Sequence, residues 1–323
     1  MADFDLFNGD ADGIFSLLQL RSVEPRDAEL VTGVKRDIKL FGRIAGRVGA
    51  GDRVTALDIS MAKNTAALTR VLEDGAQVFF CDHHLTGDVP DHPNLHAITD
   101  DSKVTCTAFL IDTHLGGAKT AWAICGAFGD NFPQLAQAMQ ARSGVDVSMS
   151  ALRELGELVN YNAYGLTLDD LHMHPADLYQ TLARYDGPKA FLEAETALVS
   201  ELRAVHASDW QIAQSARELD VTDRGQVLAL PSGAASNRIA GLFGNALVVE
   251  EPDVAFAVLT ALDGEEAYRV SIRAPRSRKT GSAAELATAF GGGGRAAAAG
   301  IDLLAEDDLD RFIEAFRETF QTA

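Results

Sequence analysis

Acidic and imidazole side chains gather in three short stretches of the first third of the chain. They are Asp10 and Asp12 in "NGDADG" (8–13), Asp58 in "LDIS" (57–60), and Asp82, His83 and His84 in "FCDHHL" (79–84). Carboxylate oxygens and imidazole nitrogens together suit manganese or another transition ion better than a pure magnesium site. Taken singly, each stretch has a plainer interpretation, because Asp and Gly favour turns and helix caps and adjacent histidines are often surface residues.

Apolar runs that predict strands precede all three stretches. We expect strands at 3–7, 30–34, 53–59 and 76–81, separated by helices at 14–23, 36–48 and 62–73. Near-continuous apolar strands alternating with helices indicate an α/β fold with a doubly wound parallel sheet. The carboxyl ends of such strands open into one crevice, so the acids and histidines should meet there. Crowded carboxylates raise one another's pKa unless a cation intervenes, and this favours a site for one or two divalent ions over chance polarity.

Composition limits the classes to which the chain can belong. Its 323 residues carry 47 acids and 28 bases, a formal net charge of −19. This size predicts about two globular domains, and the negative charge argues against a protein that coats duplex nucleic acid. Cys81, Cys106 and Cys125 form no paired motif, the acidic start is not a signal peptide, and no apolar run could span a bilayer. We therefore expect a cytoplasmic protein without membrane contact.

Beyond residue 104 the pattern changes twice. The span 104–215 is mostly helical in pattern: apolar residues at three- and four-residue spacing predict helices at 105–115, 120–128, 132–140, 151–161 and 189–210. The last of these is long enough to connect two domains. Strands are expected again at 226–230, 245–250, 253–262 and 267–273, with helices at 282–290 and 306–320. We predict a metal-binding core at 1–130, a helical extension and connector at 131–220, and a smaller α/β domain at 221–323. The role of the helical span 133–215 and the oligomeric state stay open.

The order "DADG", "LDIS", "DHH" resembles the motif series of the DHH phosphoesterase superfamily. Its members include RecJ-like exonucleases, oligoribonucleases, cyclic-dinucleotide phosphodiesterases, manganese pyrophosphatases and exopolyphosphatases. Their fourth motif is an Asp after a helix, and "CGAFGDNF" (125–132) offers Asp130. The resemblance implies that Asp58 bridges two Mn²⁺ ions, with Mg²⁺ as the other candidate ion. The metal ligands that it implies are Asp10, Asp12, Asp58, His83 and Asp130, with Asn8 as a further oxygen ligand. The catalytic group that it implies is Asp58, Asp82, His83 and His84.

The last hundred residues resemble the DHHA1 domain that accompanies many of these enzymes. "GGGRAAAAG" (292–300) is similar to its Gly-Gly-Gly-His-x-x-Ala-Ala-Gly signature, and "YRVSIRAP" (268–275) to its strand with a substrate-facing arginine. Consecutive glycine amides can converge on an anion, and a helix start after them would add a favourable dipole. A flexible Gly/Ala linker is the alternative. The substrate-binding set implied by the resemblance is Asn237, Arg238, Arg273, Gly292, Gly293, Gly294 and Arg295.

Three features bear on the choice of substrate. Asn8 stands where RecJ-like members usually have a further Asp, which would weaken one metal site, and Arg295 replaces the signature histidine. Arginine can grip a phosphate but cannot act as an acid near neutral pH. The basic stretch "RAPRSRK" (273–279) is either a solvated loop or a guide that draws a phosphate chain towards the metals.

The sequence predicts a manganese-dependent phosphoesterase in which metal-activated water attacks a short oligonucleotide or a small nucleotide phosphate. The C-terminal domain would clamp the substrate phosphates. The partner would be a small nucleotide or a short single-stranded nucleic acid. Two alternatives stay open: an exopolyphosphatase or pyrophosphatase with the same metal centre, and a catalytically silent homologue that binds phosphate ligands.

Overall fold

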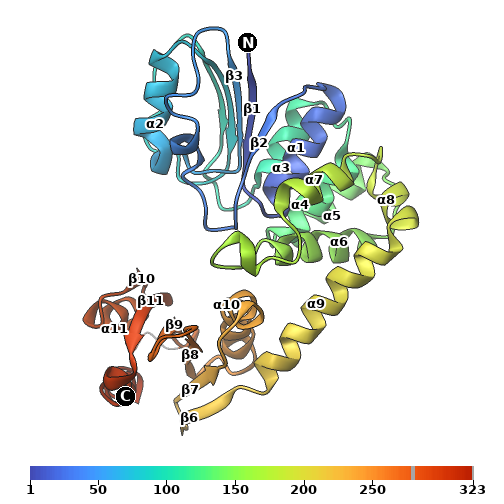
Figure 1. Ribbon diagram of the computed structural model, residues 1–323. Coiled ribbons are helices and arrows are strands. Elements are labelled where there is room, and N and C mark those ends of the chain that lie inside the picture. The colour runs from blue at the N-terminus through green and yellow to red at the C-terminus, as the bar shows by residue number, and fades with distance from the viewer. Residues whose placement is uncertain (278–280, 322–323) are drawn as a thin grey trace. The chain divides into compact units, whose positions relative to one another are not determined.

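The computed structural model describes residues 1–277 and 281–321. The chain divides into two compact units, Met1–Ala204 and Val205–Ala323. The first contains a five-stranded parallel sheet and the second a six-stranded mixed sheet, each with helices packed against it (Figure 1). The α/β class expected from the sequence is confirmed.

The sheet of the first unit is doubly wound. Its strands are β1 (Asp3–Phe7), β2 (Glu29–Val31), β3 (Arg53–Leu57), β4 (Gln77–Asp82) and β5 (Leu95–Thr99). They lie in the order β2-β1-β3-β4-β5, and all pairs are parallel. Because the chain moves outward in one direction from β1 to β2 and in the other from β3 to β5, the winding reverses between β1 and β3. Ligands of such sheets bind at the carboxyl ends of the strands beside this reversal.

Helices cover both faces of this sheet, which explains why most residues of its strands are apolar. One face packs against α1 (Ala11–Val23), α3 (Thr107–His114) and α4 (Thr120–Gly129), and the other against α2 (Met61–Glu73) and the 3₁₀ helix η1 (Leu40–Arg43) (Figure 1). Successive side chains of a strand alternate between the two cores. Leu6 and Ala56 thus pack on the α2 side, whereas Phe7 and Leu57 pack on the α1 side.

The helix predicted at 36–48 is wrong. The segment forms turns around η1, and Gly46 within it has a φ of 84°. The side chain of Asn64, on α2, donates to the carbonyl of Ile38 at 2.6 Å and accepts from the amide of Phe41 at 3.3 Å. These bonds satisfy backbone groups that a helix would have paired internally. The strand β5 was not expected from the sequence.

The remainder of the first unit is helical. Its helices are α5 (Pro133–Ser143), α6 (Met149–Asn162), α7 (Pro175–Leu182) and α8 (Pro188–Ala194), with a 3₁₀ helix η2 (Leu168–Asp170), and α9 (Thr196–Gln214) runs on into the second unit. The sequence did not predict α7, and Glu195 separates α8 from α9 where one long helix was expected. Among the helices that the structure describes, none has the length and apolarity to cross a membrane.

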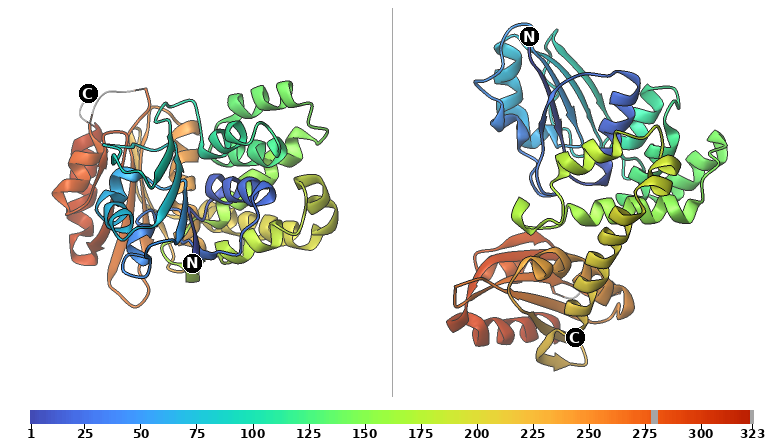
Figure 2. Two further views of the ribbon diagram at one scale, coloured as in Figure 1. Left: turned by 90° about the horizontal axis from the view of Figure 1, so that it is seen from above. Right: turned by 45° about the vertical axis from the view of Figure 1, so that its right-hand side comes forward.

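The second unit is a mixed sheet between two helical layers (Figure 2). Its strands are β6 (Arg217–Thr222), β7 (Gly225–Leu230), β8 (Ala255–Ala261), β9 (Ala267–Arg273), β10 (Gly293–Arg295) and β11 (Ala298–Ala305). They lie in the order β10-β11-β9-β8-β7-β6. Helices α11 (Ala283–Ala289) and α12 (Leu309–Gln321) pack on one face, and α10 (Ala234–Glu250) packs on the other.

Two expectations for this unit are wrong. Residues 245–250 are the last turns of α10 and not a strand, because Val248 belongs to a helical face that packs against Phe256 of β8. The glycine run is followed by the strand β11 and not by a helix start, so the expected helix dipole is absent there. A backbone of glycine and alanine pairs closely enough to form the hairpin β10–β11.

Candidate metal centre

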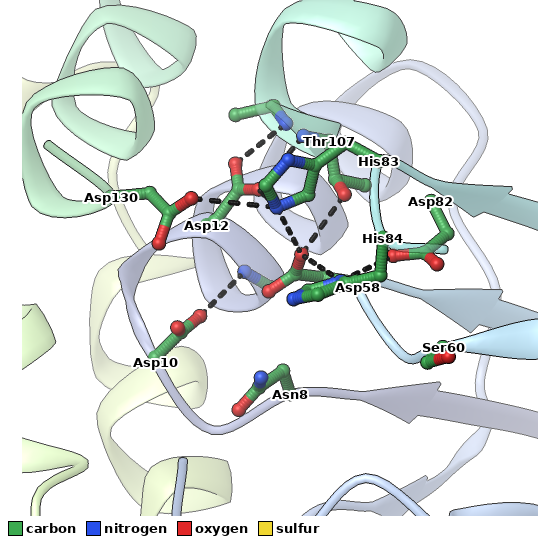
Figure 3. A network of polar contacts seen from close by, with 12 residues as sticks. Asn8, Asp10, Asp12, Asp58, Ser60, Asp82, His83, His84, Thr107 and Asp130 are labelled. Atoms are coloured by element: carbon green, nitrogen blue, oxygen red, sulfur yellow. Dashed lines mark hydrogen bonds and ion pairs between the residues drawn. The ribbon is translucent and has the colours of Figure 1, made fainter. Parts of the chain in front are cut away.

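Three carboxylates converge on one ring nitrogen of His83. Its Nε2 atom lies 3.6 Å from Oδ2 of Asp12, 3.5 Å from Oδ1 of Asp58 and 3.4 Å from Oδ2 of Asp130 (Figure 3). Asp12 is in the first turn of α1, Asp58 follows β3, His83 follows β4, and Asp130 ends α4. The doubly wound sheet and one helix end therefore bring together groups that lie up to 118 positions apart, from 12 to 130.

The N-terminus of α3 fixes the carboxylate of Asp12. Its two oxygens accept hydrogen bonds from the amides of Thr107 and Ala108, both at 2.7 Å. The hydroxyl of Thr107 donates to Oδ1 of Asp58 at 3.0 Å. Amides at a helix start favour negative charge. One helix end therefore orients two of the acids that face His83.

Asp58 occupies a left-handed backbone conformation, with a φ of 59°. Asp adopts this conformation more readily than most residues, and strained backbone of this kind often occurs at functional sites. Its side chain is 1% exposed. Burial, followed by the negative charges of Asp12, Asp10, Asp130 and Asp82, raises the pKa of Asp58 well above its usual value. A buried, crowded carboxylate of this kind gains most from a neighbouring cation.

Asp82 and His84 form a pair beside these acids. Oδ1 of Asp82 lies 2.7 Å from Nδ1 of His84, so the carboxylate holds the proton on that nitrogen. Burial lowers the pKa of His84, but the hydrogen bond and charge of Asp82 outweigh it and leave the pKa above its ordinary value. The His84 side chain is 40% exposed, the most open of the histidine and acid groups here.

Asp10 is engaged by a lysine that sequence reasoning missed. Oδ1 of Asp10 caps α1 by accepting from the amide of Gly13 at 3.1 Å, and Oδ2 accepts from the ammonium of Lys35. Burial raises the pKa of Asp10, yet the Lys35 charge and these hydrogen bonds hold it below its usual value. Burial would lower the pKa of Lys35, but Asp10 and Asp130 raise it well above its usual range. The pair is therefore charged.

Asp130 and Asn8 complete the set. Burial raises the pKa of Asp130 to about 6, against the attraction of Lys35 and with the help of Asp12 and Asp10. Asn8 is 3% exposed, and its Oδ1 atom has no hydrogen-bond partner within the described part of the chain. A buried oxygen without a donor is an available ligand.

The donors present fit a divalent ion. Two groups of described residues have ligand atoms that all lie within 4.8 Å of one another, namely Asp12, His83 and Asp130, and Asp58, His83 and His84. Carboxylate oxygen mixed with imidazole nitrogen suits Mn²⁺ and related ions, and the raised pKa of Asp58 marks the charge that an ion would neutralise.

The residues expected to bind substrate lie in the second unit, where several have structural partners. Arg238 forms two hydrogen bonds with Asp209, at 2.7 and 2.9 Å. Arg273 of β9 donates to Oδ1 of Asn245 on α10 at 2.7 Å, and Asn237 lies in the first turns of the same helix. Arg295 is exposed on β10. Arg278 and Lys279, from the basic stretch, lie outside the described residues.

The glycines of the hairpin differ in what they must accommodate. A Cβ atom on Gly292 would lie 2.2 Å from the carbonyl oxygen of Gly300. Gly294 has a φ of 150°, and a Cβ there would lie 2.5 Å from Cα of Ala299. Gly293 has nothing within 4 Å. The fold therefore requires glycine at two of the three positions.

Sequence reasoning missed Lys35 and Thr107 as neighbours of the acids. Lys35 follows β2, and the rule that strand ends share one crevice could have pointed to it. Thr107 gave no local signal, because only the packing of α3 brings it to Asp58.

Comparison with known proteins agrees with this architecture. Residues 225–322 match the family model of the DHHA1 domain. A structure of exonuclease RecJ bound to manganese has 18% identity, covers 98% of this chain and 89% of that chain, and gives a TM-score of 0.67. A structure of the pGpG-specific phosphodiesterase PggH from Vibrio cholerae has 16% identity, covers 98% of this chain and 97% of that chain, and gives a TM-score of 0.55. A structure of an exopolyphosphatase-related protein from Bacteroides fragilis has 13% identity, covers 98% of this chain and 92% of that chain, and gives a TM-score of 0.54. No curated protein sequence matches the chain.

At these identities the likeness to solved structures is one of fold. The chain has the fold of the RecJ structure, with an N-terminal α/β domain followed by a region that matches the DHHA1 domain. The resemblance of the last hundred residues to the DHHA1 domain is confirmed, and the fold implied by the motif series is the fold of these solved structures.

Proposed function

We propose that this chain is a metal-dependent phosphoesterase that prefers Mn²⁺ and hydrolyses a linear dinucleotide or another short oligonucleotide. The observation that carries the proposal is the convergence of Asp12, Asp58 and Asp130 on Nε2 of His83, at 3.4–3.6 Å. Buried carboxylates are rarely gathered without a cation, because each raises the pKa of the others. Two structural neighbours support the ion and the substrate class, since one is described as bound to manganese and the other as pGpG-specific.

Asp12, Asp58, His83 and Asp130 would hold the ion. When bound, such an ion polarises a phosphoryl oxygen and lowers the pKa of a water molecule towards neutrality. Residues of α3 would hold two of these ligands in position. The amides of α3 keep Asp12 turned towards His83, and the hydroxyl of Thr107 keeps Asp58 there. Fixed ligands require no reorganisation during reaction.

His84 is the group that we assign to the phosphate or its leaving oxygen. Asp82 holds its Nδ1 proton, which leaves Nε2 as the free position of the ring. Because Asp82 raises the pKa of His84, more of the imidazole is protonated near neutral pH and Nε2 can donate a proton.

In the second unit, β10 is the strand that would bind a phosphate. This strand is at the edge of its sheet, so one side of its backbone has no strand partner in the described chain. Gly293 has open space around it, and Arg295 is exposed beside it. Free backbone amides next to an arginine suit a phosphate. The predicted compartment remains the cytoplasm, in keeping with three free buried cysteines, Cys81, Cys106 and Cys125.

A panel of substrates tests the proposal. Metal-free protein should cleave pGpG or a short single-stranded oligonucleotide only after Mn²⁺ is added, and Mg²⁺ should support a lower rate. The same panel should contain 3′-phosphoadenosine 5′-phosphate, pyrophosphate and tripolyphosphate, because one neighbour is described as exopolyphosphatase-related. Faster cleavage of tripolyphosphate would favour that second function. Binding without turnover of any compound would indicate a silent phosphate-binding homologue.

A further inference from the structure

Lys35 is surrounded by oxygen acceptors. Its Nζ atom donates to Oδ2 of Asp10, to Oδ1 of Asp130 at 3.3 Å and to Oδ1 of Asn160 at 3.1 Å. An ammonium group has three N–H donors, so this set satisfies all of them. The amide of Lys35 donates to the carbonyl of Ala163 at 2.9 Å, which fixes the backbone from which the side chain extends. A cation is thus built into the site by the chain itself.

Asn8 secures the same arrangement. Its Nδ2 atom donates to the carbonyl of Lys35 at 3.4 Å. A carboxylate at this position could not donate that hydrogen bond. The amide also brings no negative charge to the side of the centre where Asp10 lies. Asn8 and Lys35 therefore act together. Asn8 lacks the negative charge that would attract a metal ion, and Lys35 supplies a positive charge beside Asp10.

Asp10 is the acid that this arrangement removes from metal binding. Neither group of described residues with metal-ligand spacing includes it. Both of its oxygens already accept hydrogen bonds, Oδ1 from Gly13 and Oδ2 from Lys35. A divalent ion bound to Asp10 would lie next to the ammonium of Lys35, which occupies the same carboxylate. Two positive charges in direct proximity repel strongly in a buried site.

We infer that Lys35 replaces a second metal ion at Asp10, so that the centre binds one divalent ion, through Asp12, Asp58, His83 and Asp130. This inference rests on the proposed function, because it takes the metal centre as given. It departs from the two-ion centre expected from the sequence. Lys35 becomes a positioning residue that holds Asp10 and Asp130 in place of an ion.

Counting bound manganese tests the inference without reference to activity. Full-length protein is dialysed to equilibrium against Mn²⁺, its metal content is measured, and its electron paramagnetic resonance spectrum is recorded. Wild type should bind one ion per chain and give the spectrum of isolated Mn²⁺. Lys35→Met keeps the length of the side chain and removes its charge. It should bind a second ion at least about tenfold more tightly than wild type does and give the spectrum of exchange-coupled ions.

Two controls separate charge from other effects. Lys35→Arg keeps the charge and should bind one ion, and Lys119→Met, which removes a lysine that pairs with Asp186, should also bind one. Two coupled ions in wild type would overturn the inference while leaving the proposed function intact. One ion in folded Lys35→Met would overturn it as well. No ion in wild type would instead remove the metal centre itself. Should Lys35→Met fail to fold, Lys35→Gln takes its place, and the wild-type count still decides.

Discussion

Nε2 of His83 lies 3.5 Å from Oδ1 of Asp58, although the two residues follow different strands. Adjacent parallel strands β3 and β4 end side by side, and the left-handed turn at Asp58 directs its carboxylate towards the histidine. The pair lies within the candidate metal centre that Asp12, Asp58, His83 and Asp130 form.

Asp58→Asn should weaken Mn²⁺ binding by more than the about 10–100-fold typical of losing an outer partner, because it removes a charged ligand. Asparagine tolerates the left-handed backbone, so the fold should persist. The ion-free variant should melt no lower than ion-free wild type, since a buried charge is gone. Metal analysis and thermal unfolding check both points. Asp88→Ala, which changes an exposed acid after β4, is the matched control. Full manganese occupancy in Asp58→Asn would contradict the assignment.

Thr107→Val should lower Mn²⁺ affinity or turnover by about 10–100-fold, because it removes the hydroxyl that orients Asp58 but leaves the amide that binds Asp12. The measurement is the Kd for Mn²⁺ by calorimetry, alongside kcat/KM. Thr113→Val on the same helix is the control, because its hydroxyl bonds only within α3. Equal losses in both variants would mean that the helix, and not the hydroxyl, is responsible.

Ion-free protein should lose stability as the pH rises through about 6. Burial raises the pKa of Asp130 to about 6, so the folded state binds more protons than the unfolded state between the two pKa values. Stability is then greatest at the acidic side of this window and falls as Asp130 ionises. Mn²⁺ at roughly a hundred times its Kd should restore about 2.7 kcal/mol. Thermal melts across pH, with and without chelator, measure this. Asp130→Asn should flatten the ion-free slope, and an unchanged slope would assign the effect to other groups.

Gly293→Ala and Gly294→Ala should have opposite consequences. A methyl at Gly294 meets the backbone of Ala299 and forces a residue with a φ of 150°, so it should destabilise the second unit by about 1–3 kcal/mol. A methyl at Gly293 meets no atom within 4 Å and should leave stability unchanged. If the backbone of β10 contacts a phosphate, Gly293→Ala should nevertheless raise KM. Unfolding curves measure the stability of both variants, and steady-state kinetics measure their KM. An unchanged KM in Gly293→Ala would mean that Gly293 does not contact the substrate.

Arg295→Ala should reduce kcat/KM by about ten- to hundredfold, because a charge-assisted hydrogen bond to phosphate contributes roughly 1.5–3 kcal/mol. Bound manganese should not change. Arg295→His, which restores the family residue, should shift the preference among pGpG, a terminal monophosphate and tripolyphosphate. Arg311→Ala, an exposed arginine of α12, is the control. Identical kinetics for wild type and both Arg295 variants on every substrate would leave Arg295 without a role in binding.

The class of the fold and most acids of the centre could be predicted from the pattern of residues alone. The strands predicted at 3–7 and 267–273 match β1 and β9 residue for residue. In β9, apolar residues alternate with Arg269, Ser271 and Arg273, which is the two-residue period of a strand. Asp12, Asp58 and His83 could be found because each lies shortly after a strand, and parallel strands end at one edge of a sheet. Asp130, which ends α4, was implied by the motif resemblance. The ligand roles assigned to Asp12, Asp58, His83 and Asp130 stay predictions that metal analysis will decide.

The neighbours of these acids, and the conformation of some apolar segments, depend on tertiary packing and could not be predicted from the sequence. The apolar residues 246–249 would suit a strand or a helix, and they are helical because they continue α10 and pack on Phe256. Lys35 carries no motif, yet the packing of β2 and α6 brings its ammonium between Asp10, Asp130 and Asn160. Thr107 reaches Asp58 for the same reason. Local patterns record which residues a strand or helix contains, whereas contacts between distant elements depend on how those elements pack.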